Sequence, residues 1–378
     1  MTAADVIVIG GGIVGCALAY HLRAHGRSVV VVERHGVGHE GSGRNAGGVR
    51  QQARVPAELP LAMAAVERWP ALERELGAPT EYVQEGNLLI AQSEASVRRL
   101  EQRLAWQAPF GLDSTLIDGD QLRRLRPLVG PRARAALHCP SDGHANPLLA
   151  TLAFAGAARR RGAAFAVGHE VRGLRQTTAG WMVETDRARF EGEVVVNVAG
   201  PGAVALCALV DVALPVVPAR TQTLVTERVG PLFGQFVQDW DAKVFARQTW
   251  SGTVIFGDLT EDYLVAGHQA RPADAVRAAR AAIDAFPAFA RLTVIRGWGG
   301  VLDISLDRMP LIGPLDGLPG FFVCAGSSGH GFALAPAIGE LLADWIARGR
   351  RSPLLAPFDP ARFSATGTID NNAEEGAA

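Results

Sequence analysis

The chain has 378 residues, of which 48% are hydrophobic and 20% are charged, as expected of a globular protein long enough for two domains. The formal net charge of −1 argues against a nucleic-acid or membrane-surface partner, since both attract basic proteins. The apolar stretch 6–20 is too short and glycine-rich to span a bilayer, and no signal segment is seen. We therefore expect a cytoplasmic protein without a membrane span.

The cysteines and histidines give no sign of a metal site. No CxxC pair occurs, and no histidine, cysteine and carboxylate cluster has a familiar metal-ligand spacing. Three of the four cysteines lie in apolar runs, so we expect reduced thiols in the core. The four cysteines are Cys16, Cys139, Cys207 and Cys324.

The first 34 residues predict a strand, a glycine turn, a helix and a second strand. Gly10 permits the tight turn, Gly12 lets a pyrophosphate approach the backbone, and Gly15 lets the helix pack closely. Unpaired N–H groups at the start of this helix attract phosphate. The second strand ends at Glu33, whose carboxylate can accept hydrogen bonds from a ribose. This order of parts predicts a dinucleotide-binding unit.

A polar, glycine-rich loop follows at residues 41–52. Its glycines and side-chain donors suit close approach to a ligand, and its place directly after the ribose-binding strand predicts that it faces the cofactor. Farther along, Asn146 and Pro147 predict the N-cap and first turn of a helix. Helices are predicted at 61–76, 95–106, 118–125, 147–160, 273–286 and after residue 332. In helix 273–286 the expected apolar face comprises Val276, Ala279, Ile283 and Phe286.

Strands alternate with these helices. Parallel-type, fully apolar strands occur near the start, at 194–198 and at 321–326, whereas the strands between them have an antiparallel pattern. The other predicted strands are 82–91, 133–138, 163–167, 171–176, 181–185, 188–190, 216–226, 244–248, 253–257 and 292–303.

This order predicts an α/β protein whose dinucleotide-binding domain the chain enters three times. The discontinuous, Rossmann-like domain would comprise residues 1–81, 146–215 and 304–363. Residues 82–145 and 216–303 would form a mainly antiparallel β-sheet domain, with flanking helices, for the substrate. We expect the small, polar tail 364–378 to be disordered.

Four segments together resemble the FAD-dependent D-amino-acid oxidase superfamily. They are the opening βαβ unit, Gly-Arg-Asn-Ala-Gly at 43–47, Val-Asn-Val-Ala-Gly at 196–200 and Ser-Gly-His-Gly-Phe at 328–332. The resemblance covers roughly residues 4–363. It is strongest to the β subunits of sarcosine oxidase, to proline and hydroxyproline dehydrogenases, and to opine oxidases.

The resemblance implies an FAD-binding domain and oxidation of the C–N bond of an amino acid or N-substituted amino acid. Hydride would pass to flavin N5, and the resulting imine would hydrolyse in water. The alternative is a β subunit of a multi-subunit amine dehydrogenase or oxidase, assembled with α and γ partners and with little activity alone. A homo-oligomer is also open. A monooxygenase that uses NADPH is disfavoured, because no second glycine-rich nucleotide motif is seen.

The resemblance also assigns cofactor contacts. The pyrophosphate would lie against Gly10, Gly12, Ile13, Val14, Gly15 and Gly200. The adenosine end would meet Glu33, Arg34 and Val171. The ribityl chain and ring would meet Ser42, Arg44, Asn45 and Ala46. A helix N-terminus at Gly329, His330, Gly331, Phe332 and Ala333 would face the flavin C2 carbonyl and stabilise negative charge there.

Departures from the family pattern are equally informative. Gly300 or Val301 stands where monomeric sarcosine oxidases attach flavin to a cysteine, so we expect non-covalent FAD. Ala333 replaces their lysine, and Leu302 stands roughly where glycine oxidase has a carboxylate-binding arginine. The only lysine, Lys243, lies outside the strands expected to line the ring, which predicts a better dehydrogenase than oxidase.

Arg50, at the end of the glycine loop, is the remaining candidate for binding the substrate carboxylate, with a salt bridge or phosphate contact as the open alternative. Arg247 is a second candidate. His330 would either donate to the flavin ring or orient its turn, and Trp298 would either line the substrate pocket or pack in the core. We interpret His144 and His268 as ordinary loop or surface residues.

Overall fold

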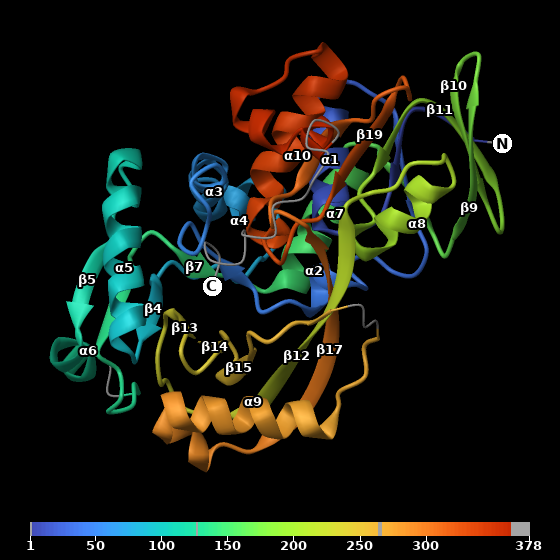
Figure 1. The fold of residues 1–378 in the computed structure, drawn as a ribbon. Helices are drawn as coiled ribbons and strands as arrows, with labels where there is room; N and C mark the ends of the chain where they lie inside the picture. Colours follow the sequence, from blue (N-terminus) through green and yellow to red (C-terminus); the bar gives the residue numbers. More distant parts are fainter. Residues whose placement is uncertain (1, 126–127, 264–266, 364–378) are drawn as a thin grey trace.

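The computed structural model describes residues 2–125, 128–263 and 267–363 (Figure 1). The predicted disordered tail, 364–378, lies outside these residues. Two large sheets organise the chain. The first has the order β18-β19-β11-β1-β2-β8, with β9 and β10 attached to β11 through β10. Its strands are β1 (Thr2–Ile9), β2 (Val29–Glu33), β8 (Ala164–Val167), β9 (Val171–Thr177), β10 (Gly180–Thr185), β11 (Arg189–Asn197), β18 (Leu311–Pro314) and β19 (Phe321–Ala325).

The first sheet is buried on both faces. β1 pairs in parallel with β2 and β11, and its side chains alternate between two apolar clusters. Val6 and Val8 pack under the helices α1 (Ile13–Ala24), α7 (Pro147–Arg160) and α10 (Gly331–Arg348). Ile7 and Ile9 pack toward β9, β10 and α8 (Ala203–Ala208). The apolar runs of the sequence thus become the centre of a covered, mostly parallel sheet.

The second sheet has the order β16-β12-β15-β14-β13-β4-β6-β5, with β17 beside β12. Apart from the parallel pair β4–β13, its pairs are antiparallel. Its strands are β4 (Asn87–Ala91), β5 (Thr115–Asp118), β6 (Ala135–Cys139), β12 (Val216–Arg228), β13 (Phe236–Asp239), β14 (Val244–Gln248), β15 (Thr253–Asp258), β16 (Asp262–Tyr263) and β17 (Val294–Ser305).

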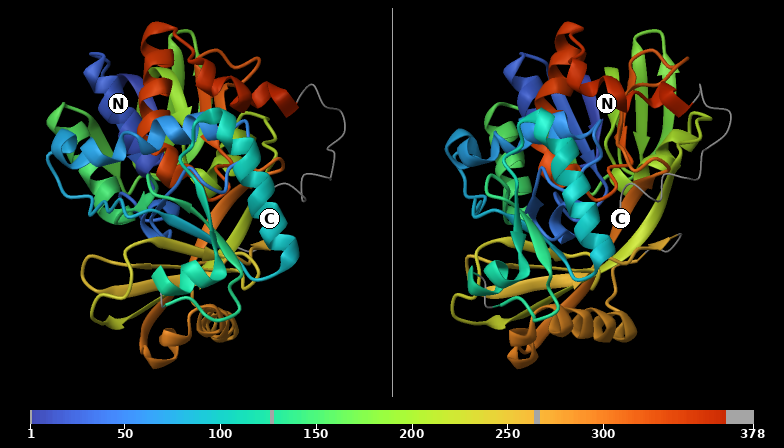
Figure 2. Two further views of the ribbon diagram at one scale, coloured as in Figure 1. Left: turned by 90° about the vertical axis from the view of Figure 1, so that its left-hand side faces the viewer. Right: turned by 60° about the vertical axis from the view of Figure 1, so that its left-hand side comes forward.

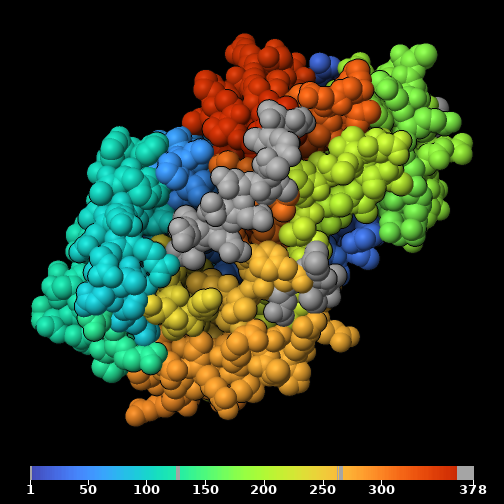
Figure 3. All heavy atoms as spheres, in the orientation of Figure 1, coloured from blue at the N-terminus to red at the C-terminus, as the bar shows by residue number. Residues whose placement is uncertain are grey.

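Helices pack on both faces of the second sheet. Helix α9 (Pro272–Ala285) covers β12, β14 and β15 on the side away from the first sheet, and α5 (Glu94–Gln107) packs on the opposite face, against β4, β5 and β6 (Figures 1 and 2). Figure 3 shows these parts as the base and one flank of the molecule. The remaining elements are α2 (Gly41–Arg44), α3 (Leu59–Val66), α4 (Leu72–Leu76), α6 (Gly119–Leu125) and the small pair β3 (Gly48–Val49) and β7 (Gly143–His144).

Most predicted elements are confirmed, and several are wrong in ways that have physical causes. The expected helix 61–76 is broken into α3, a 3-10 turn and α4, because Pro70 cannot donate a helical hydrogen bond. The strand expected at 82–91 begins only at Asn87, since Gly86 has a φ of +92°. The strands expected at 188–190 and 194–198 are one strand, β11, which pairs with both β10 and β1.

The apolar face predicted for α9 is also wrong in part. Val276 and Ile283 are 50% and 39% exposed, whereas the buried face consists of Ala278, Ala282 and Ala285. Small side chains are selected here because the helix lies close to the sheet. The N-cap of α7 is confirmed, since the Asn146 side chain accepts a hydrogen bond from the Leu149 N–H. No described helix has the length and apolar character needed to cross a bilayer.

Candidate functional site

A deep cleft opens where β1, β2 and β11 end, between the first sheet and β17. Most residues predicted to contact the cofactor line this cleft: Gly10, Gly12, Ile13, Val14, Glu33, Arg34, Ser42, Asn45, Val171, Gly200, Gly329, Gly331 and Phe332. Leu302, predicted to contact substrate, lines it as well. The other predicted cofactor contacts, Gly15, Arg44, Ala46, His330 and Ala333, are not among the residues that line it.

The glycine turn leaves space for a ligand beside its backbone and allows the turn and the start of α1 to pack closely together. Gly10 has a φ of +119°, which side-chain-bearing residues rarely adopt. A Cβ on Gly15 would overlap the Gly10 carbonyl oxygen, and one on Gly12 would lie 2.9 Å from the Ser42 Oγ. The N-cap residue of α1, Gly12, has no side chain, and the Ile13 N–H donates to Ser42 Oγ at 2.9 Å. A helix N-terminus beside bare glycine backbone fits the pyrophosphate of a dinucleotide.

Glu33 has two roles at this turn. Its Oε2 accepts the Gly11 N–H at 2.7 Å, and its Oε1 accepts the His35 N–H at 2.7 Å. A carboxylate can accept more bonds than these two, so Glu33 still has acceptor capacity toward the cleft. The carboxylate therefore fixes the turn and the loop that follows it while lining the cleft.

The glycine loop lies between the cleft and one face of the second sheet. The register of β12 with β17 and of β14 with β15 puts Trp298, Leu302 and Arg247 on this inner face. Trp298 Nε1 donates to the Arg44 carbonyl at 2.9 Å, and Arg247 Nε donates to the Ala46 carbonyl. Both side chains hold the loop in place.

Arg50 lies at the same face with its charge unpaired by any described carboxylate. Its Nη1 donates to Gln238 Oε1 at 2.6 Å, and its guanidinium lies 5.4 Å from the centre of the Phe236 ring. The buried Nε has no hydrogen-bond partner. Burial and the neighbouring Arg54 lower the pKa of Arg50, opposed by the carboxylates of Asp142 and Glu58, and the side chain remains charged at neutral pH. A partly buried charge with no described carboxylate within ion-pair distance favours an anionic ligand.

A buried ion pair that the sequence analysis missed stands behind Arg50. Glu58 is fully buried and lies 3.9 Å from the Arg54 Nε. His330 Nδ1 lies 3.0 Å from Glu58 Oε1. Burial would raise the pKa of Glu58, but His330 and Arg54 outweigh it and the pKa is lowered. Burial and Arg54 lower the pKa of His330, so a neutral imidazole donates to an ionised carboxylate.

Asp303 is a second buried carboxylate that was not predicted from the sequence. It lines the cleft, and its carboxylate accepts the N–H groups of Gly326 at 2.8 Å and Ser327 at 3.2 Å. Burial raises its pKa to about 6 despite these bonds. Asp303 thereby braces the turn from β19 into α10. No sequence motif marks Asp303 or Glu58, because each acts through residues distant in the chain.

The structure also shows the surroundings of His144, His268 and the four cysteines. His144 is buried rather than an ordinary loop residue, and its Nε2–H donates to the Gly234 carbonyl at 3.0 Å. His268 lies 2.9 Å from Glu40. All four cysteines are buried and free, as predicted. Cys324 lines the cleft, and burial raises its pKa to about 12.

A family model described as "DAO: FAD dependent oxidoreductase" matches residues 5–345. The chain belongs to this family. FAD is therefore its cofactor, and the cleft built on the Gly10–Gly15 turn fits that dinucleotide. The predicted superfamily, fold class and enzyme class, an FAD-dependent oxidoreductase, are confirmed.

Known relatives match nearly the whole chain. Sarcosine oxidase subunit beta of Rhodobacter capsulatus is 28% identical over 99% of this chain and 92% of the relative. Human mitochondrial dimethylglycine dehydrogenase is 26% identical over 95% of this chain, which spans only 44% of that longer protein. The structure of L-proline dehydrogenase from P. horikoshii superimposes with a TM-score of 0.91 at 28% identity, covering 96% of this chain and 98% of that one.

Proposed function

We propose that this chain oxidises the C–N bond of an amino acid or N-substituted amino acid. The observation that carries the proposal is Arg50, whose guanidinium stands at the inner face of the second sheet without a carboxylate partner among the described residues. A planar fork of N–H donors suits a substrate carboxylate. The relatives are named for sarcosine, dimethylglycine and proline, whose C–N bonds all lie beside a carboxylate, and they support the same substrate class.

The chain's own residues would bind the cofactor and position the substrate. The Gly10–Gly15 turn would hold the pyrophosphate, Glu33 and Val171 the adenosine, and the loop from Ser42 to Ala46 the ribityl chain and ring. Bound FAD supplies the acceptor for the hydride released from the substrate carbon. The N–H groups at the start of α10 would stabilise negative charge on the bound cofactor. The imine product would hydrolyse in water.

Arg247 favours a second, narrower substrate class. Arg247 is 3% exposed, lies on β14 next to β13, which carries Phe236, and has no described carboxylate within ion-pair distance. Two arginines at the inner face suit a substrate with two carboxylates, such as an imino diacid. Arg247 also holds the Ala46 carbonyl, so a purely structural role is the competing explanation.

The alternative is a β subunit that needs partner subunits, and it is supported by the relatives named sarcosine oxidase subunit beta. The cytoplasmic location also stays a prediction.

One experiment separates the enzyme that is active alone from the subunit that needs partners. The purified chain is mixed anaerobically with sarcosine, proline, glycine and iminodiacetate, and the loss of yellow flavin absorbance is followed. Bleaching by any of these supports an enzyme active alone. If FAD is bound and no amino acid bleaches it, the subunit proposal is favoured.

A further inference from the structure

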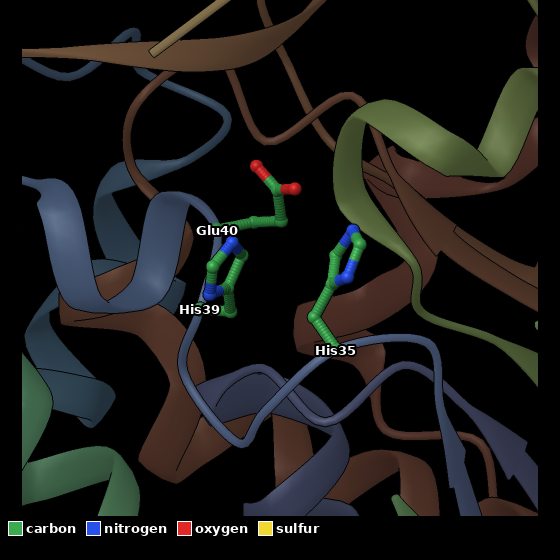
Figure 4. A group of neighbouring side chains, drawn as sticks. All are labelled: His35, His39 and Glu40. Carbon is green, nitrogen blue, oxygen red and sulfur yellow. The ribbon is translucent and has the colours of Figure 1, made fainter. Parts of the chain in front are cut away.

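Three side chains on the loop between β2 and α2 gather around one point. His35, His39 and Glu40 each offer a ligand atom, and these atoms all lie within 4.8 Å of one another (Figure 4). The two imidazole rings lie 4.8 Å apart, centre to centre. Both histidines are exposed and Glu40 is partly so, which leaves the side chains free to adjust.

The loop backbone that carries them is fixed by hydrogen bonds. The His35 N–H donates to Glu33 Oε1 at 2.7 Å, and the Gly38 N–H donates to the Gly11 carbonyl at 3.0 Å. The His39 carbonyl accepts from Arg44 Nε at 2.7 Å. The positions of the three Cα atoms are therefore set by the cofactor-binding turn itself, and only side-chain rotation remains.

A third imidazole approaches from a distant part of the chain. His268, which precedes α9, has its Nε2 2.9 Å from Glu40 Oε2. Its ring lies 6.3 Å from that of His39, and its buried Nδ1 has no hydrogen-bond partner. On the other side, Arg34 Nη2 lies 3.4 Å from Glu40 Oε1. One carboxylate is thus surrounded by three imidazoles and one exposed guanidinium.

We propose that His35, His39 and Glu40 bind a divalent transition-metal ion of the zinc type, with His268 as the residue that orients Glu40. Imidazole nitrogens combined with a carboxylate oxygen favour Zn²⁺, Cu²⁺ or Ni²⁺ over Mg²⁺ or Ca²⁺. Tetrahedral Zn²⁺, with ligand bonds of about 2.0–2.1 Å, needs ligand atoms about 3.3 Å apart. Because the ligand atoms lie within 4.8 Å of one another, rotation of the side chains would have to close at most about 1.5 Å.

No metal site was predicted from the sequence, because no cluster of histidine, cysteine and carboxylate has a familiar metal-ligand spacing. The fold adds His268, which contacts the Glu40 carboxylate from a distant part of the chain. Since His39 and Glu40 line the cofactor cleft, the ion would sit on its rim. There it would link the loop after β2 to the segment before α9, and Glu40 would exchange its contact with Arg34 for the metal.

Calorimetric titration of the FAD-loaded protein with ZnCl₂ tests the proposal. Wild-type protein should bind one Zn²⁺ per chain at this site. His39→Asn and Glu40→Gln should each weaken that binding on the order of 100-fold, because each removes one of three ligands. His268→Ala should weaken it about 10-fold, the effect of losing a group that orients a ligand. His169→Asn is the matched control, since His169 lies on the same cleft but outside the cluster.

The FAD content of each variant is measured first, and any variant that loses FAD is compared with wild-type protein stripped of FAD. Binding that His169→Asn preserves and the cluster variants lose supports the site. Wild-type protein that binds no Zn²⁺ would overturn the proposal. So would His39→Asn and Glu40→Gln variants that bind it as tightly as wild type, which would locate the ion at another histidine.

Discussion

His330 and Glu58 form a buried hydrogen bond, 3.0 Å from Nδ1 to Oε1, between the start of α10 and the start of α3. The pairing fixes the imidazole tautomer, because an ionised carboxylate can only accept. It leaves Nε2 as the other nitrogen of the His330 ring, without a proton while the ring is neutral. In this state His330 cannot donate from Nε2 to the flavin ring, which favours the other predicted role, that of orienting its turn.

We expect Glu58→Gln to lower kcat/KM by roughly 10- to 100-fold while FAD remains bound. A hydrogen bond to a charged group is worth about 1.5–3 kcal/mol, and the amide no longer fixes the His330 tautomer. The variant should also be less stable, because Arg54 loses its carboxylate. Anaerobic flavin reduction measures the first effect and urea unfolding the second. Glu67→Gln, an exposed neighbour, is the control; equal kcat/KM for the two variants would contradict the role of Glu58.

We expect Arg50→Met to lower kcat/KM about 30- to 1000-fold, the loss of about 2–4 kcal/mol from a charge-assisted pair in a desolvated site. FAD content should stay unchanged, because Arg50 lies outside the cofactor cleft lining. The control is Arg296→Met on the exposed part of β17. Near-normal kcat/KM, or simple loss of FAD, would count against carboxylate binding by Arg50.

The glycine turn could be predicted from sequence because its constraint is local. Gly10 has a positive φ, and Gly15 has no room for a Cβ. Because the two residues are only five positions apart, both requirements are visible as a short sequence pattern. The inner face of the second sheet could not be predicted in the same way. Arg247 and Trp298 share that face through strand register, and their common contact with the loop at Arg44 and Ala46 joins segments some 200 residues apart.

The same contrast explains the missed carboxylates. Glu58 precedes α3 with no signature, and its partners Arg54 and His330 become visible only when α10 packs against α3. Asp303 ends the strand predicted at 292–303, a position that many surface aspartates occupy, although β17 continues to Ser305. Its burial follows from the turn at Gly326 and Ser327 folding over it. Residues that act through tertiary contacts can be identified only from the folded structure.

We expect acid precipitation to release all the yellow FAD into the supernatant. Gly300 and Val301 offer no nucleophile, and the one cysteine on the cleft lining, Cys324, is held as an unreactive thiol by its raised pKa. Flavin that remains with the pellet would overturn non-covalent binding. Peptide mapping would then identify the attached residue, with the cleft histidines His39 and His169 examined first.

We expect stability to fall as the pH drops below about 6.5, partly through His144. Burial and then Arg247 lower its pKa to about 3, whereas an unfolded histidine titrates near 6.5. Between these values only the unfolded state binds the proton, so acid favours unfolding. At pH 5 the contribution is about 2 kcal/mol. His144→Gln should shrink the difference in unfolding free energy between pH 8 and pH 5, as measured by urea unfolding at the two pH values.

The reduced enzyme should pass electrons to a quinone or dye faster than to oxygen. A positive charge beside the flavin helps oxygen accept an electron, because it stabilises the negatively charged superoxide that forms there. Lys243, the only lysine, is exposed in the turn between β13 and β14 with a φ of +52°, and it is not among the residues that line the cleft.

Arg50 and Arg247, at the inner face of the second sheet, are the cations that could help oxygen react in place of a lysine. His330 carries no charge, because its pKa is lowered. Arg50 would be occupied by the substrate carboxylate, and Arg247 donates to Ala46. The enzyme is reduced anaerobically with its substrate, and stopped-flow absorbance compares reoxidation by air with reoxidation by the dye. If air is as fast, the prediction fails, and loss of that oxygen reactivity in Arg50→Met or Arg247→Met would identify the cation responsible.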